Sequence, residues 1–92
     1  MEIKWTDTDP ESGERRFIRA TRHAGFWKFH YRSTRRGVWT RLHPPTIPMW
    51  DAVLDSLERR YQRREGVTDE DLALVRGILA TLRARHEVGE EE

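Results

Sequence analysis

Apolar and polar residues alternate with a period of two through the first 43 residues of the chain. Successive side chains of a β-strand point to opposite faces, so this period predicts strands with one buried face. Segments rich in turn-forming residues separate the strands, which favours an antiparallel meander. We expect a short first strand around Ile3 and Trp5, then strands over 15–23, 26–32 and 38–43.

The short connections predict how these strands pair. A two-residue turn at 24–25 sets one register, and a four-residue loop over 33–36 sets the next. Both registers gather apolar residues on the same side of the sheet, as a single buried face requires. The predicted apolar pairs are Ile18–Tyr31, Ala20–Phe29, Tyr31–Val38 and Trp27–Leu42.

Two amphipathic helices are predicted after the strands. Residues 43–45 contain two prolines and end the sheet, because proline cannot continue a ladder. Apolar residues at helical spacing predict helices over about 47–65 and 69–86, which Thr46 and Thr68 are suited to cap. We therefore predict an α+β fold, a four-stranded antiparallel meander (β-β-β-β) followed by a two-helix hairpin packed on one sheet face.

Length and composition favour one domain over residues 1–86, because 92 residues are too few for two independent cores. Residues 87–92 include four glutamates and have nothing to bury, so we expect a disordered acidic tail. There is no cysteine for disulfides or thiolate chemistry. Neither a secretory signal nor an apolar run of about 20 residues is visible, so we expect a cytoplasmic protein without a membrane partner. Fifteen of the 17 basic residues are arginine, which is typical of a GC-rich bacterial genome.

Charge is strongly segregated along the chain. The net charge is only +1, yet residues 14–45 carry nine Lys or Arg against one acid. The sheet face opposite the apolar one is predicted to display basic side chains, three histidines and two large aromatics from strands two to four, with no acid among them. The candidate binding residues are Arg19, Phe26, Lys28, His30, Arg32, Trp39 and Arg41, with Arg35 and Arg36 in the adjoining loop.

The predicted registers place Lys28 opposite Arg41, His30 beside Trp39 and His43 beside Phe26. Like charges directly opposite each other reduce stability unless an anion neutralises them. Aromatic rings beside cations suit base stacking combined with phosphate contacts. We therefore expect a small binding domain for single-stranded RNA or DNA.

Two alternatives stay open for this face. The first is an ordinary solvated surface, on which Arg and Lys stems cover the aromatic rings. The second is an interface with another protein or with a second copy, in which Phe26 and Trp39 are the buried anchors.

No complete catalytic or metal signature accompanies the surface. The three histidines have no carboxylate predicted beside them, and two of them stand two strands apart. Acidic residues at positions 7, 9 and 11 have the spacing that opens a calcium loop, yet Ser12 replaces its glycine and Ile18 its bidentate Glu. Phosphate-binding glycine loops, nucleophile elbows and catalytic carboxylate pairs are also missing. We expect no enzyme activity, no metal and no cofactor.

Overall fold

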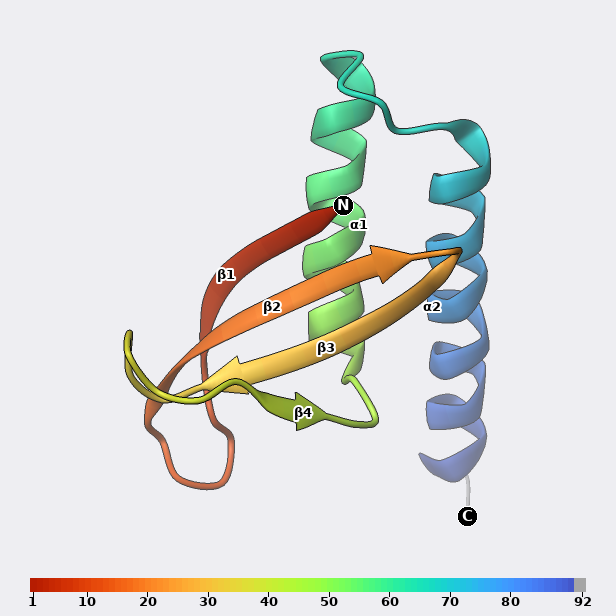
Figure 1. Cartoon of the computed structure of the whole chain (residues 1–92). Helices are drawn as coiled ribbons and strands as arrows, with labels where there is room; N and C mark the ends of the chain where they lie inside the picture. The colour runs from red at the N-terminus through yellow and green to blue at the C-terminus, as the bar shows by residue number, and fades with distance from the viewer. Residues whose placement is uncertain (91–92) are drawn as a thin grey trace. The chain divides into compact units, whose positions relative to one another are not determined.

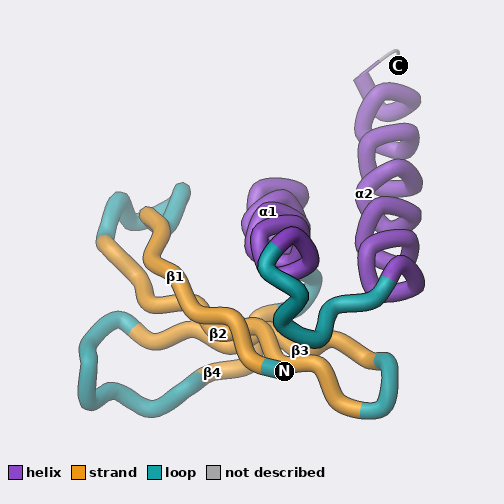
Figure 2. Tube along the Cα trace, turned by 90° about the horizontal axis from the view of Figure 1, so that it is seen from above, coloured by secondary structure: helices purple, strands orange, loops and turns teal. Residues whose placement is uncertain are grey.

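The computed structural model describes residues 1–90 of the chain and confirms the predicted order of elements (Figure 1). The chain forms two compact units, one from Met1 to Pro45 with the strands and one from Thr46 onward with the helices. Figure 2 distinguishes strands, helices and loops by colour. The elements are β1 (Glu2–Thr8), β2 (Arg15–His23), β3 (Phe26–Arg32), β4 (Thr40–Leu42), α1 (Ile47–Gln62) and α2 (Asp69–Glu90).

The four strands form one antiparallel sheet in the order β1-β2-β3-β4. The pairing of β2 with β3 is as predicted, with Ala20 opposite Phe29. The turn between them uses Ala24 and Gly25 at φ values of 52° and 81°. Positive φ at both central residues defines the two-residue turn whose twist matches that of paired strands. β1 joins the sheet with Ile3 opposite Ala20.

The predicted register of β4 is wrong by two residues. Leu42 lies opposite Phe29 rather than Trp27, and Tyr31 lies opposite Thr40 rather than Val38. The predicted strand over 38–43 is also shorter than expected, since β4 contains only Thr40–Leu42. A shift of two residues keeps every side chain on the same face, so the assignment of residues to faces holds.

The longer connection between β3 and β4 explains the shift. It runs over residues 33–39 rather than 33–36. Within it, the amide of Gly37 donates to the carbonyl oxygen of Thr34 at 3.1 Å, which closes a β-turn. Val38 and Trp39 follow this turn before pairing resumes at Thr40. A loop of this length has no fixed two-residue geometry to set the register.

One face of the sheet is buried. Ile3, Ile18, Ala20 and Phe29 are each at most 4% exposed. The ring of Trp5 meets that of Phe29 edge-on, with centroids 6.4 Å apart and planes at 82°. Burial of these side chains is the main source of stability for the strand unit.

The helical unit begins with well-formed caps. The Thr46 hydroxyl accepts a hydrogen bond from the Met49 amide at 3.4 Å. At the start of α2, the Asp71 amide donates to the Thr68 hydroxyl at 3.2 Å, and the Thr68 amide donates to the Asp71 carboxylate at 2.9 Å. This reciprocal capping box satisfies two amides that a helix start leaves unpaired.

The two helices bury a common apolar stripe and are linked by ion pairs. Arg76 of α2 lies 3.6 Å from the Glu58 carboxylate of α1, and Arg83 lies 2.6 Å from that of Asp51. The buried side chains of this unit are Met49, Trp50, Val53, Leu57, Val67, Leu72, Val75 and Leu79.

The helix ends differ from the predicted ones. α1 ends at Gln62 rather than 65, and α2 continues to Glu90 rather than ending at 86. The acidic tail expected over 87–92 therefore overlaps the last turn of α2, and its final two positions lie outside the described residues. A single domain over 1–86, with the hairpin packed on the sheet, stays a prediction. No helix in the described part of the chain is both long and apolar enough to cross a membrane.

Candidate nucleic-acid interface

A row of basic side chains crosses the sheet on the face opposite its buried residues, which we term the open face. Lys4 of β1 lies opposite Arg19 of β2, Arg19 lies opposite His30 of β3, and His30 lies opposite Arg41 of β4. We term these four residues the cationic row. Adjacent strands lie about 4.8 Å apart, so the row spans roughly 14 Å from one sheet edge to the other. Lys4 and Arg41 are exposed, while Arg19 and His30 are half-buried.

The predicted neighbours of Arg41 and Trp39 are wrong, because of the register of β4. Arg41 lies opposite His30 and not opposite Lys28. Trp39 precedes β4 and is not paired beside His30, and His43 follows the end of that strand rather than pairing beside Phe26. The observed register makes the centre of the face more basic than predicted, because Arg19, His30 and Arg41 of three successive strands are adjacent there.

Trp39 is held by two arginines. The guanidinium carbon of Arg19 lies 4.5 Å from the centroid of the Trp39 ring, and that of Arg32 lies 4.3 Å from it. Both distances are within the range of cation–π attraction. The Nε atoms of Arg19 and Arg32 are buried and find no hydrogen-bond partner among the described residues. Arginines thus cover part of Trp39, as the solvated-face alternative expects, while their outer nitrogens keep their capacity to donate.

Phe26 has a very different environment. Its side chain is 74% exposed at the start of β3, where it lies opposite His23. Trp39 contacts Arg32 at the other end of this strand, roughly 20 Å away at about 3.3 Å per residue. The two candidate aromatics therefore do not form one continuous stacking surface. Phe26 lies at one end of β3 and Trp39 near the other, and the cationic row crosses the strand between them at His30.

The remaining candidates flank the row. Lys28 is exposed on β3 between Phe26 and His30. Arg35 and Arg36 are exposed in the middle of the turn that Gly37 closes. All nine candidate residues thus belong to the strand unit, six of them within β2–β4 and three in the connection before β4.

Three residues of this face were not among the predicted candidates. Lys4 completes the cationic row, and half-buried Phe17 lies opposite Arg32. Glu2 adds an acid, and its carboxylate lies 3.2 Å from the Lys4 ammonium. The period-two pattern already indicates this face for all three, since Glu2 and Lys4 flank Ile3 and Phe17 precedes Ile18.

The surrounding cations affect the titration of His30. Partial burial lowers the pKa of His30, and the positive charges of Arg19, Arg41 and Lys28 lower it further. Its Nδ1 is buried and has no hydrogen-bond partner among the described residues. A bound anion would oppose these effects by favouring the protonated imidazole.

Among the described residues, no group of three or more His, Cys, Asp or Glu side chains is placed to hold a metal ion. Arg16 instead pairs with two of the acidic residues, Asp7 near the end of β1 and Asp9 just after it. The Arg16 guanidinium donates two hydrogen bonds to the Asp7 carboxylate, both at 2.9 Å, and lies 3.9 Å from that of Asp9.

Comparison with protein-family models, with curated proteins and with solved structures finds no match to this chain.

Proposed function

We propose that the chain is a small non-enzymatic binding domain that holds single-stranded nucleic acid on the open face of its sheet. The observation that carries the proposal is the cationic row, in which three successive cross-strand pairs join cationic or titratable groups. Lys4 and Arg19 are positively charged neighbours, and Arg41 adds a further positive charge beside His30. An anion bound on the row would reduce the repulsion among these cations. Phosphate groups of a nucleic-acid strand supply anions in series.

The donors of the row suit phosphate oxygens. Arg19 and Arg41 offer planar guanidinium groups, which can donate two parallel hydrogen bonds to one phosphate. Lys28, beside the row, adds an exposed ammonium group. None of Arg19, Lys28 and Arg41 has an acidic partner among the described residues, so these three can bind an anion without breaking an internal ion pair, whereas Lys4 is paired with Glu2.

The aromatic residues support a single strand over a duplex. Phe26 exposes most of its ring at one end of β3, where an unpaired base can stack on it. A base of a duplex is already stacked and paired, so its ring faces are not available. Trp39, held by two arginines, offers at the other end a ring whose position is already fixed.

Fluorescence anisotropy with labelled ten-nucleotide oligo-dT and oligo-U tests the proposal at 20, 50 and 150 mM NaCl. We expect binding that weakens steeply with salt, with a slope of log K against log[salt] of about −2 to −3 for three or four phosphate contacts on a single strand. Arg41→Ala should weaken binding about tenfold and reduce the magnitude of the slope by about one.

Arg63→Ala is the matched control, because Arg63 is also an exposed arginine but belongs to the helical unit. It should leave affinity and slope unchanged. Equal losses from both variants would indicate non-specific attraction to a basic protein, and no binding at 20 mM NaCl would exclude the proposal.

The exposure of Phe26 also favours a second candidate function, a protein–protein interface with Phe26 as its anchor. An interface centred on an aromatic side chain depends weakly on ionic strength. Binding of a protein that Phe26→Ala abolishes, and that 150 mM NaCl leaves unchanged, would support this second function instead.

A further inference from the structure

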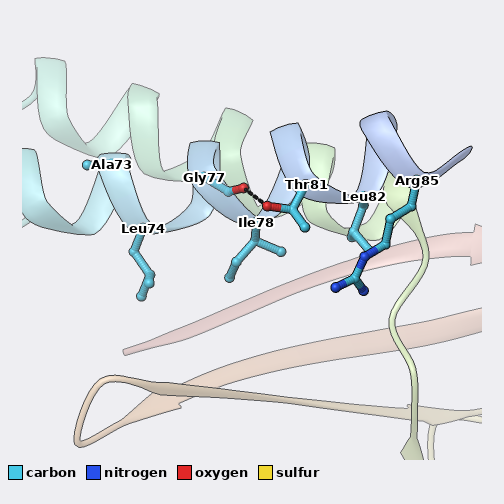
Figure 3. Close-up of a pocket in the computed structure, with 7 residues that line it drawn as sticks. All are labelled: Ala73, Leu74, Gly77, Ile78, Thr81, Leu82 and Arg85. Carbon is cyan, nitrogen blue, oxygen red and sulfur yellow. Dashed lines mark hydrogen bonds between the residues drawn. The ribbon is translucent and has the colours of Figure 1, made fainter. Parts of the chain in front are cut away.

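We infer that helix α2 pairs with α2 of a second copy of this chain, in an antiparallel arrangement centred between Gly77 and Ile78. This inference concerns the helical unit and is independent of the function proposed for the sheet. It begins with an apolar face of α2 that the buried core of the unit does not include. The residues of this face are Leu74, Gly77, Ile78, Thr81, Leu82 and Arg85, which line a shallow groove (Figure 3).

The face is apolar and accessible. Leu74 is 44% exposed, and Ile78 and Leu82 are half-buried. The hydroxyl of Thr81 donates to the carbonyl oxygen of Gly77 at 3.0 Å, so it is satisfied within its own helix (Figure 3). Leu74, Thr81 and Gly77 recur at spacings of three and four residues, the period with which one helix contacts another.

Gly77 marks where the second helix comes closest. Glycine in a helix interior lowers helix stability relative to alanine. A Cβ atom built at Gly77 would lie within 4 Å of nothing, so no neighbour in the described chain requires glycine there. The absence of a side chain at this point allows two helix axes to approach at the short end of the usual 8–10 Å range.

Charge complementarity identifies the occupant as a second copy. A two-fold axis between positions 77 and 78 places Glu70 of one chain level with Arg85 of the other, and the reverse. Each residue lies about 11 Å along the helix from the axis, at 1.5 Å per residue. Both are exposed and have no ion-pair partner among the described residues, whereas Arg76 and Arg83 of the same helix pair with α1.

The same axis brings Leu74 level with Thr81 of the second copy. Leu74 would then fill the space beside the partner's small side chains, and the two Glu70–Arg85 pairs would flank this apolar centre. A parallel arrangement would instead place the two Arg85 groups together and the two Glu70 groups together. The antiparallel arrangement is therefore the one that the charges allow.

Sedimentation velocity of the full chain between about 5 and 500 µM tests the inference. A single pair of helices buries less than the roughly 1,200 Å² of a standard interface, so we expect a weak dimer with Kd of about 10–100 µM. Arg85→Glu places like charges together twice and should raise the Kd at least tenfold. The double variant Glu70→Arg, Arg85→Glu restores both opposite-charge pairs and should return the Kd to within about threefold of the original.

Gly77→Ala provides a test that does not depend on charge. It should raise helix content, because alanine favours the helix, and weaken the dimer, because the added methyl group separates the axes. Glu87→Arg, a charge change equal in size and opposite in sign to that of Arg85→Glu, lies at an exposed position on the other side of α2 and should leave the Kd unchanged.

Circular dichroism of each variant confirms that it folds. A chain that stays monomeric at 500 µM would overturn the inference. A dimer whose Kd responds to neither Arg85→Glu nor Gly77→Ala would also overturn it, since the contact would then lie elsewhere.

Discussion

Two arginines of β2, three residues apart, have opposite environments. Arg16 lies on the same face as the buried residues, with a side chain that is 11% exposed. It donates two hydrogen bonds to Asp7 and lies 5.7 Å from the centroid of the Tyr31 ring. Its hydrogen bonds with Asp7 raise the pKa of Arg16, so the group is charged at every relevant pH. Arg19, on the open face, has Trp39 beside it and forms no ion pair with an acid of the described residues.

The contrast shows which arginines of the sheet are paired with acidic residues and which are not. The chain contains 16 acidic residues, and two of them lie against Arg16, whose side chain is only 11% exposed. A desolvated guanidinium without a carboxylate would be unstable, so Arg16 must be matched internally. On the open face, Arg19 is half-buried and Arg41 is exposed, and neither forms an ion pair with a described acid, so their positive charge remains available to a ligand. The two faces therefore predict opposite responses to substitution.

The largest difference between the faces in the effect of a substitution on the free energy of unfolding is expected for two phenylalanines of β3. Phe29, 1% exposed, is part of the buried face, whereas Phe26 is 74% exposed. Phe29→Ala should reduce the free energy of unfolding by about 3–5 kcal/mol, because it leaves a cavity. Phe26→Ala should change it by less than about 0.5 kcal/mol.

Urea denaturation followed by tryptophan fluorescence measures both values. Oligonucleotide titration of the same samples should show the reverse order, with binding lost in Phe26→Ala and kept in any Phe29→Ala protein that remains folded. A loss of stability in Phe26→Ala as large as that in Phe29→Ala would mean that the open face is covered.

A smaller difference in the free energy of unfolding is expected between the alanine variants of Arg16 and Arg41. Arg16→Ala should reduce the free energy of unfolding by about 1–2 kcal/mol, because Asp7 loses two charge-assisted hydrogen bonds. Arg41→Ala should leave stability unchanged or raise it by up to about 0.5 kcal/mol, because it removes an exposed positive charge from a face on which Arg19 and Lys28 are also positive.

Salt offers an independent check on these two variants. Added NaCl screens repulsion on the exposed face, so it should stabilise the wild-type chain and have less effect on Arg41→Ala. If Arg41→Ala destabilised the chain as much as Arg16→Ala, then Arg41 would have an internal role, and the comparison between the faces would fail.

The same comparison explains which features the sequence alone could predict. The faces of the sheet followed from period-two alternation, which depends only on the geometry of each strand. The pairing of β2 with β3 followed as well, since a two-residue turn at Ala24 and Gly25 allows one register. Both features are local, so neighbouring residues determine them.

The register of β4 could not be predicted in this way. The loop over 33–39 contains several residues that can belong either to the turn or to the strand, and Val38, expected in β4, is 86% exposed outside it. The position of Trp39 is set by Arg19 and Arg32, which come from two other strands. A contact among three separate segments has no signature in the local pattern, so the composition of the open face was predictable and its arrangement was not.

The smallest expected effect concerns the protonation of His30. Partial burial, together with Arg19, Arg41 and Lys28, holds the pKa of His30 below its ordinary value of 6.5 in the folded chain. Between the folded and unfolded pKa values the unfolded chain binds more protons, so the free energy of unfolding rises with pH there. This contribution is complete above pH 6.5 and is lost progressively as the pH falls from 6.5 through the folded pKa.

Replacing His30 by Gln removes the titrating group, so the urea midpoint of His30→Gln should fall less than that of the wild type between pH 7.5 and 5. Titration of the imidazole by NMR measures the pKa directly, without and with a short oligonucleotide. The nucleic-acid proposal requires the pKa to rise when phosphate binds, because a negative charge favours the imidazolium. A pKa below 6.5 that the oligonucleotide leaves unchanged would mean that phosphate does not reach the cationic row. A pKa at or above 6.5 in the free chain would mean that the positive charges of the open face are already neutralised, and the contrast with Arg16 would disappear.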